Sequence, residues 1–94
     1  MNTTKVSGKN TKNRVFLYTL STCGWCKKTK EYLKDQGVAY EYLDVDKCSK
    51  DDQKEAVEDL KRRNAPVAFP AIIINDKTLI TGFKKDAIDE ALGL

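Results

Sequence analysis

Hydrophobic positions recur along the chain with two different periods, which predict alternating strands and helices. Residues 15–19 form a β-branched and aromatic run, short enough for a buried strand. Over residues 23–36 the apolar positions take helical spacing among lysines, and Gly37 follows where a left-handed helix cap is favoured. Residues 39–45 alternate again. The first half of the chain therefore predicts a strand, a helix and a second strand.

The second half predicts four further elements. A serine N-cap followed by acids opens a helix over residues 49–63. Residues 71–74 are continuously apolar, and a tight turn at residues 75–77 leads to a strand at residues 78–80. Residues 86–92 predict a last amphipathic helix. The order β-α-β-α-β-β-α indicates an α/β fold in which three helices flank a mixed four-stranded sheet with a right-handed parallel crossover.

Length and charge restrict the organisation of the protein. Its 94 residues fit one domain, which we place at residues 14–94, after a flexible polar tail at residues 1–13. The net charge of +3 is mild and the charges are interleaved, so we expect no nucleic-acid partner. No apolar run approaches the roughly 18–20 residues that span a bilayer, and no secretory signal is apparent. We expect a cytoplasmic monomer without a membrane partner.

The absence of histidine excludes several mechanisms. A Ser-His-Asp triad, a Cys–His nucleophile pair and histidine-ligated zinc or haem all require this residue. Any nucleophile in the chain must therefore be activated by other means.

The motif Cys-Gly-Trp-Cys at residues 23–26 carries the candidate chemistry. Two cysteines three positions apart on the first turn of a helix can close a disulfide. A helix N-terminus favours negative charge, and Lys27 and Lys28 add positive charge nearby, so we expect these lysines to stabilise a thiolate. Cys23, at the helix start, is expected to be the exposed nucleophile. Cys26, on the apolar face, is expected to be its buried partner.

These positions predict thiol–disulfide exchange. The Cys23 thiolate attacks a substrate disulfide, and Cys26 then resolves the mixed disulfide. A zinc site is the alternative, but zinc prefers four ligands and Cys48 is the one further sulfur. We therefore expect no metal and no cofactor other than the redox-active disulfide itself. Cys48 is either a regulatory thiol or a small surface residue, and we favour the second interpretation.

The chain resembles the glutaredoxin branch of the thioredoxin superfamily over residues 14–94. The resemblance rests on residues 17–19 (Leu-Tyr-Thr) and 22–26 (Thr-Cys-Gly-Trp-Cys) before a lysine-rich helix, on residues 69–71 (Phe-Pro-Ala), on residues 82–83 (Gly-Phe), and on the order of the elements. It is strongest toward the hydrogen-donor redoxins of ribonucleotide reductase and the prokaryotic glutaredoxin-like proteins. It implies a thioredoxin-like fold and a substrate surface formed by Trp25, Phe69, Pro70, Gly82 and Phe83.

Two residues have roles that depend on this resemblance. The family implies a cis peptide at Pro70 facing the dithiol, where the adjacent backbone pairs with an extended substrate. Trp25 either lies against the dithiol as part of that surface or packs beside Tyr18.

The usual glutathione-binding residues of the family are replaced here. Glutaredoxins usually carry a basic residue three positions before the first cysteine, where this chain has Leu20. They also carry an acidic pair after the glycine turn, where this chain has Lys84 and Lys85. The stretch Gly-Phe-Lys-Lys-Asp is more similar to the hydrogen-donor redoxins, which take electrons from thioredoxin reductase.

The resemblance thus implies a set of partners. The electron donor is expected to be a reductase of the thioredoxin-reductase or ferredoxin-linked type, or glutathione. The clients are protein disulfides, with ribonucleotide reductase as a candidate. The alternative function is an iron–sulfur cluster carrier, in which Cys23 from two chains and low-molecular-weight thiols hold a [2Fe–2S] cluster.

Overall fold

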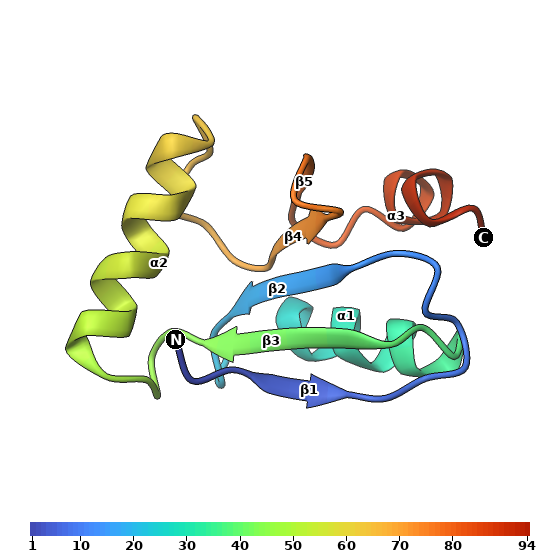
Figure 1. The fold of residues 1–94 in the computed structure, drawn as a ribbon, viewed down its shortest axis with the longest axis horizontal. Helices are drawn as coiled ribbons and strands as arrows, with labels where there is room; N and C mark the ends of the chain where they lie inside the picture. The colour runs from blue at the N-terminus through green and yellow to red at the C-terminus, as the bar shows by residue number, and fades with distance from the viewer.

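The computed structural model describes all residues 1–94 as a mixed sheet with helices on both faces (Figure 1). It contains three helices and five strands: α1 (Gly24–Asp35), α2 (Lys50–Arg62), α3 (Lys85–Leu92), β1 (Thr4–Val6), β2 (Val15–Thr19), β3 (Tyr40–Asp44), β4 (Ala71–Ile74) and β5 (Thr78–Thr81). The strand order across the sheet is β1-β3-β2-β4-β5. Only β2 and β3 are parallel. No helix is both long and apolar enough to cross a membrane.

Strand β2 is the centre of the sheet, as its apolar run predicts. It pairs with β3 on one side and with β4 on the other, so that Leu17 lies between Tyr42 and Ile72. Side chains of successive residues point to opposite faces of a strand. Leu17 therefore joins the core beneath α1 and α3, whereas Tyr18 joins the core beneath α2.

Each predicted helix and strand is present within one or two residues of its expected bounds. Ser49 caps α2 by accepting a hydrogen bond from the backbone N–H of Asp52 (3.1 Å). Gly37 takes a left-handed φ of 70° just after α1. Asn75 and Asp76 both have positive φ in the turn between β4 and β5, the conformation that matches the twist of a hairpin. The predicted α/β fold class is confirmed.

The number of strands differs from the prediction, because the sheet has five strands rather than four. The added strand, β1, pairs antiparallel with β3, with Thr4 opposite Tyr42 and Val6 opposite Tyr40. The prediction of a tail outside the sheet is therefore corrected for Thr4–Val6. Three residues with one apolar side chain give almost no periodic signal, since backbone pairing rather than side-chain burial holds such an edge strand.

The segment after β1 passes directly over the start of β3. Asn10 donates to the carbonyl of Gly37 (2.9 Å) and accepts from the N–H of Ala39 (3.0 Å). A Cβ atom at Gly8 would lie only 2.6 Å from the backbone nitrogen of Ala39. Glycine is therefore required at position 8 by close approach of two backbones.

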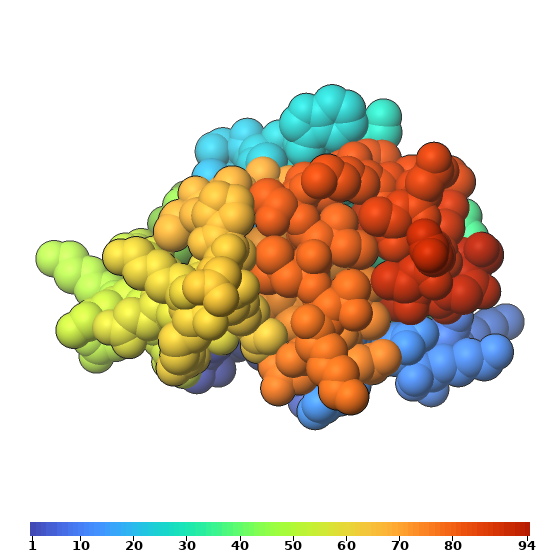
Figure 2. All heavy atoms as spheres, turned by 90° about the horizontal axis from the view of Figure 1, so that it is seen from above, coloured from blue at the N-terminus to red at the C-terminus, as the bar shows by residue number.

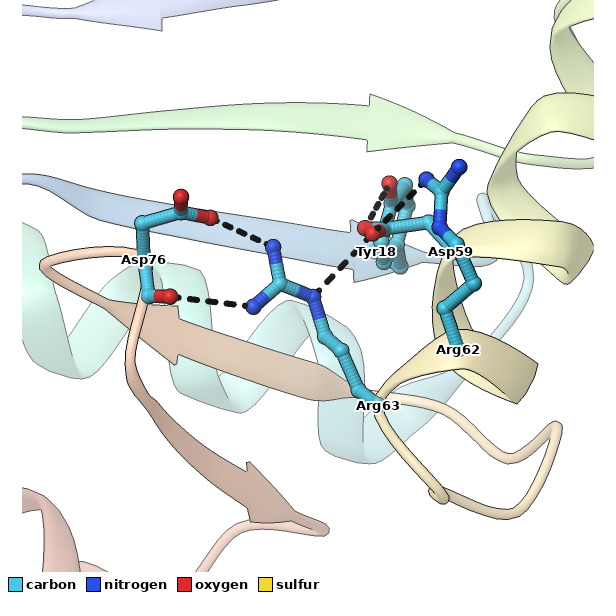
Figure 3. A network of polar contacts seen from close by, with 5 residues as sticks. All are labelled: Tyr18, Asp59, Arg62, Arg63 and Asp76. Atoms are coloured by element: carbon cyan, nitrogen blue, oxygen red, sulfur yellow. Dashed lines mark hydrogen bonds and ion pairs between the residues drawn. The ribbon is translucent and has the colours of Figure 1, made fainter.

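A polar network fastens α2 to the sheet (Figure 3). Tyr18 Oη donates to Asp59 Oδ2 (2.7 Å), and Arg63 Nε donates to Asp59 Oδ1 (3.2 Å). Arg62 adds a third bond to the same carboxylate (3.3 Å), and Arg63 continues to Asp76 in the β4–β5 turn (2.5 Å). Burial acts to raise the pKa of Asp59, but the bonds from Tyr18, Arg62 and Arg63 outweigh it and lower that pKa.

The lowered pKa of Asp59 predicts how stability changes with pH. A carboxyl whose folded-state pKa lies below its unfolded value stabilises the fold above the unfolded pKa, and this contribution is lost as pH falls through the folded pKa. We expect Asp59→Asn to lower the free energy of unfolding by about 1–2 kcal/mol at neutral pH. Urea denaturation between pH 7 and pH 2 should show this difference shrinking below about pH 4.

The matched control is Glu58→Gln, which removes an exposed carboxylate from the same helix. Its stability should follow that of the unmodified protein at every pH. A difference between the unmodified protein and Asp59→Asn that stays constant down to pH 2 would contradict the assignment.

Candidate redox site

Cys23 lies where β2 ends and α1 begins. Its backbone N–H donates to the carbonyl of Leu20 (3.1 Å), which turns the chain from strand to helix. Cys23 is the N-cap of α1, and its Sγ accepts a hydrogen bond from the backbone N–H of Cys26 (3.2 Å). A sulfur in this position receives one of the N–H groups that a helix start leaves unpaired and lies in the positive field of the helix terminus.

The two motif cysteines differ strongly in exposure, as predicted. Cys23 is half-buried, whereas Cys26 is 0% exposed. Burial, assisted by the hydrogen bond with Cys23, raises the pKa of Cys26 to about 12, although the backbone of Leu20 and the charge of Lys30 act to lower it. All three cysteines are free. The site therefore presents one reachable sulfur and one protected thiol.

A second polar contact holds the loop before Cys23. Asp46, just after β3, accepts bonds from the backbone N–H of Ser21 (2.8 Å) and from its hydroxyl (2.5 Å). These two bonds lower the pKa of Asp46, so the carboxylate form is favoured. The loop that carries the nucleophile is thus tied to the end of the neighbouring strand. This pair of contacts was not predicted from the sequence, because residues 21 and 46 meet only through the parallel pairing of β2 with β3.

Exposed Trp25 and partly buried Phe83 form an aromatic pair at the motif. Their rings stack with centroids 6.2 Å apart and 21° between planes, and Trp25 is 60% exposed. Lys28 Nζ lies 5.3 Å from the Trp25 ring and 5.9 Å from the Phe83 ring. Figure 2 shows the cyan segment of the motif beside the orange-red segment that follows β5. Trp25 thus packs against Phe83 and not beside Tyr18.

The loops around Pro70 and Gly82 lie together next to this aromatic pair. The Phe69–Pro70 peptide is cis, as the family resemblance implies. The N–H of Gly82 donates to the carbonyl of Pro70 (2.8 Å), and Gly82 has a φ of 86°. Pro70 is buried, and Phe69 packs half-buried against the core beneath α2. The substrate-contacting role of these residues stays a prediction.

The lysines of α1 have different surroundings. Lys27 is exposed and Lys28 lies over the aromatic pair, so their stabilisation of a thiolate stays a prediction. Lys30, one turn after Cys26, is half-buried and acts on the Cys26 thiol. The sequence predictions assigned Lys30 no role; its position four residues after Cys26 was the available signal.

The remaining positions lie at the margins of the site. Leu20 packs against the core beneath α2, and Lys84 is exposed. Lys85 donates to Asp89 (2.7 Å). Cys48 is half-buried, its thiol donates to the carbonyl of Val45 (3.3 Å), and burial raises its pKa.

Comparison with known proteins gives consistent matches. The family model described as glutaredoxin matches residues 15–79. The chain is similar to an uncharacterized glutaredoxin-like 8.6 kDa protein in the rubredoxin operon of Clostridium pasteurianum, with 40% identity over 76 residues, which cover 81% of this chain and 93% of that protein.

Two solved structures extend the comparison. The glutaredoxin from Methanosarcina mazei Go1 matches with a TM-score of 0.88 and 47% identity, covering 98% of this chain and 88% of that one. The methanoredoxin of Methanosarcina acetivorans matches with a TM-score of 0.81 and 46% identity, covering 86% of this chain and 85% of that one.

The difference between the two motif cysteines predicts selective alkylation. In a Cys48→Ser background at pH 8, iodoacetamide should modify Cys23 at least about tenfold faster than Cys26, because Cys26 is buried and remains a thiol far below its pKa of about 12. Peptide mass spectrometry over a time course measures both rates. The denatured chain should label both cysteines, and comparable rates in the folded protein would contradict the asymmetry.

Proposed function

Because the chain belongs to the glutaredoxin family, we propose that it reduces disulfides of client proteins through a Cys23–Cys26 dithiol. The observation that carries the proposal is the position of Cys23 Sγ. This sulfur caps α1, accepts a hydrogen bond from the N–H of Cys26 and is partly open to solvent, whereas Cys26 is buried. Family and fold together indicate thiol–disulfide oxidoreductase chemistry.

The proposed reaction takes two exchange steps. The Cys23 thiolate attacks one sulfur of the client disulfide, the client S–S bond breaks, and the departing client sulfur takes a proton from solvent. Cys26 then loses its proton and attacks Cys23 Sγ, so that the mixed disulfide breaks and the second client sulfur leaves. The client gains two electrons and two protons. The chain is left with a Cys23–Cys26 disulfide.

The exposed surface beside Cys23 supports a protein client. Trp25 and Val67 are the two large hydrophobic side chains that are exposed away from the chain ends. Trp25 belongs to the motif, and Val67 lies three residues before Pro70. An exposed aromatic side chain within a reactive motif is typical of a surface that binds another chain. The client is therefore proposed to lie across Trp25 and the Pro70 loop.

The electron donor is proposed to be a protein reductase of the thioredoxin-reductase or ferredoxin-linked type, which reduces the disulfide between Cys23 and Cys26. Cations at Lys84 and Lys85 repel the ammonium group of glutathione, and Leu20 supplies no charge for its carboxylate. These substitutions weigh against glutathione held in the usual way of the family. Ribonucleotide reductase is the candidate client protein.

Single substitutions of the cysteines test the order of the two steps. We expect Cys23→Ser to lower reduction of insulin disulfides by about a hundredfold or more, since the attacking sulfur is gone. Cys26→Ser should still attack but accumulate a mixed disulfide with the client, detectable as a covalent adduct by intact mass spectrometry.

Cys48→Ser is the matched control and should retain the activity of the unmodified protein. Full insulin reduction by Cys23→Ser, or an adduct formed through Cys26 in place of Cys23, would overturn the proposed roles.

A further inference from the structure

Lys30 is held in place more firmly than any other lysine of α1. Its Nζ lies 3.0 Å from Asp44 Oδ1 and 3.8 Å from the centroid of the Tyr42 ring. The lysine and aspartate side chains are 21% and 22% exposed. Lys27, Lys28 and Lys34 are exposed and form no ion pair. One lysine of α1, Lys30, is therefore held at the end of β3.

The partner of Lys30 is itself anchored from the central strand. Thr19, fully buried at the end of β2, directs its hydroxyl toward Asp44 Oδ1 (2.6 Å) and the carbonyl of Leu43 (3.2 Å). The ammonium group therefore has a defined position where β2, β3 and α1 meet. This is the same junction that carries the dithiol.

Stability alone gives little reason for such an arrangement. Partly exposed ion pairs contribute modestly to folding, and ordering a lysine side chain costs conformational entropy. The position of the charge is more informative. Lys30 follows Cys26 by four residues, so the two side chains occupy the same face of α1, and its positive charge favours the thiolate form of Cys26.

We propose that Lys30, held by Asp44, is a positioning residue that promotes loss of the proton from Cys26 in the second exchange step. This inference rests on the proposed function and adds a residue to it. The Cys26 proton passes to solvent, the Cys26 electron pair forms the bond to Cys23 Sγ, and the client sulfur leaves with the electrons of the mixed disulfide. The ammonium group keeps its own proton throughout and offsets the charge that develops on a buried sulfur.

The expected effect follows from the thiolate population. Below the pKa of Cys26, a rise of one unit in that pKa lowers the thiolate fraction about tenfold, while the more basic thiolate becomes roughly threefold more nucleophilic. Loss of Lys30 should therefore slow the second step by about threefold per unit of pKa increase. The first step, attack by Cys23, should change by less than about twofold, because Cys23 lies at the start of α1, about two helical turns before Lys30.

The test separates the two steps by stopped-flow fluorescence of Trp25, the single tryptophan, after mixing the reduced protein with an excess of a peptide disulfide between pH 6 and pH 10. Lys30→Met should slow the second phase and move its pH dependence to higher pH, and Lys30→Arg should restore both. Lys34→Met, which removes an exposed cation one turn further along α1, is the matched control and should behave as the unmodified protein. Cys26→Ser combined with Lys30→Met isolates the first step.

Three results would overturn the inference: an unchanged second phase in Lys30→Met, equal slowing of both phases, or failure of Lys30→Arg to restore the rate. Thermal denaturation of each variant shows whether the fold is intact, and Lys30→Gln replaces Lys30→Met if that variant does not fold. A failure of the proposed function is distinguishable, because it would abolish the first phase in every variant, including Lys34→Met.

Discussion

The junction between a buried strand and a helix start determines the rest of this structure. Strand β2 has hydrogen-bonded neighbours on both sides, so its end has a fixed position. The backbone bond from Cys23 to Leu20 begins α1 at that point, and the sulfur becomes the helix cap. One sulfur is left half-exposed and the other is buried, and this difference is the basis of the order of steps proposed for them. The start of α1 and the different exposure of the two sulfurs are therefore consequences of one turn at the end of β2.

Polar contacts at the end of β3 hold two further parts of the site, the loop before Cys23 and the side chain of Lys30. Asp46 holds the loop through Ser21, and Asp44 holds Lys30 near the buried thiol. Asp44 and Asp46 are only two residues apart, yet Asp46 binds the backbone of Ser21 and Asp44 binds the ammonium group of Lys30. On the opposite face, the Tyr18–Asp59 bond fastens α2 without contacting the motif. The network that fastens α2 therefore lies on the other face of the sheet from the contacts at the end of β3.

The sequence predicted the elements with strong periodicity and the motif at a helix start, because these depend on neighbouring residues. The run at residues 15–19 and the cap at Ser49 are local signals, and both were sufficient. Strand β1 was missed, since Thr4–Val6 are held by backbone pairing with a strand far along the chain. The Lys30–Asp44 pair was missed for a related reason. Lys30 and Asp44 are both charged residues in the sequence, but Asp44 is brought near Lys30 only by the parallel pairing of β2 and β3.

The strand order also has a consequence for how the chain folds. Only β4 and β5 are paired strands that follow one another without an intervening helix or strand, and they are joined by a turn that suits a hairpin. Every other pairing closes a long loop, and such contacts form slowly because of their entropic cost. We therefore expect the hairpin of β4 and β5 to form before β2 pairs with β3 and β4. Cys23 and Cys26 are close from the moment of synthesis, but the burial that distinguishes them arises only when the sheet is complete.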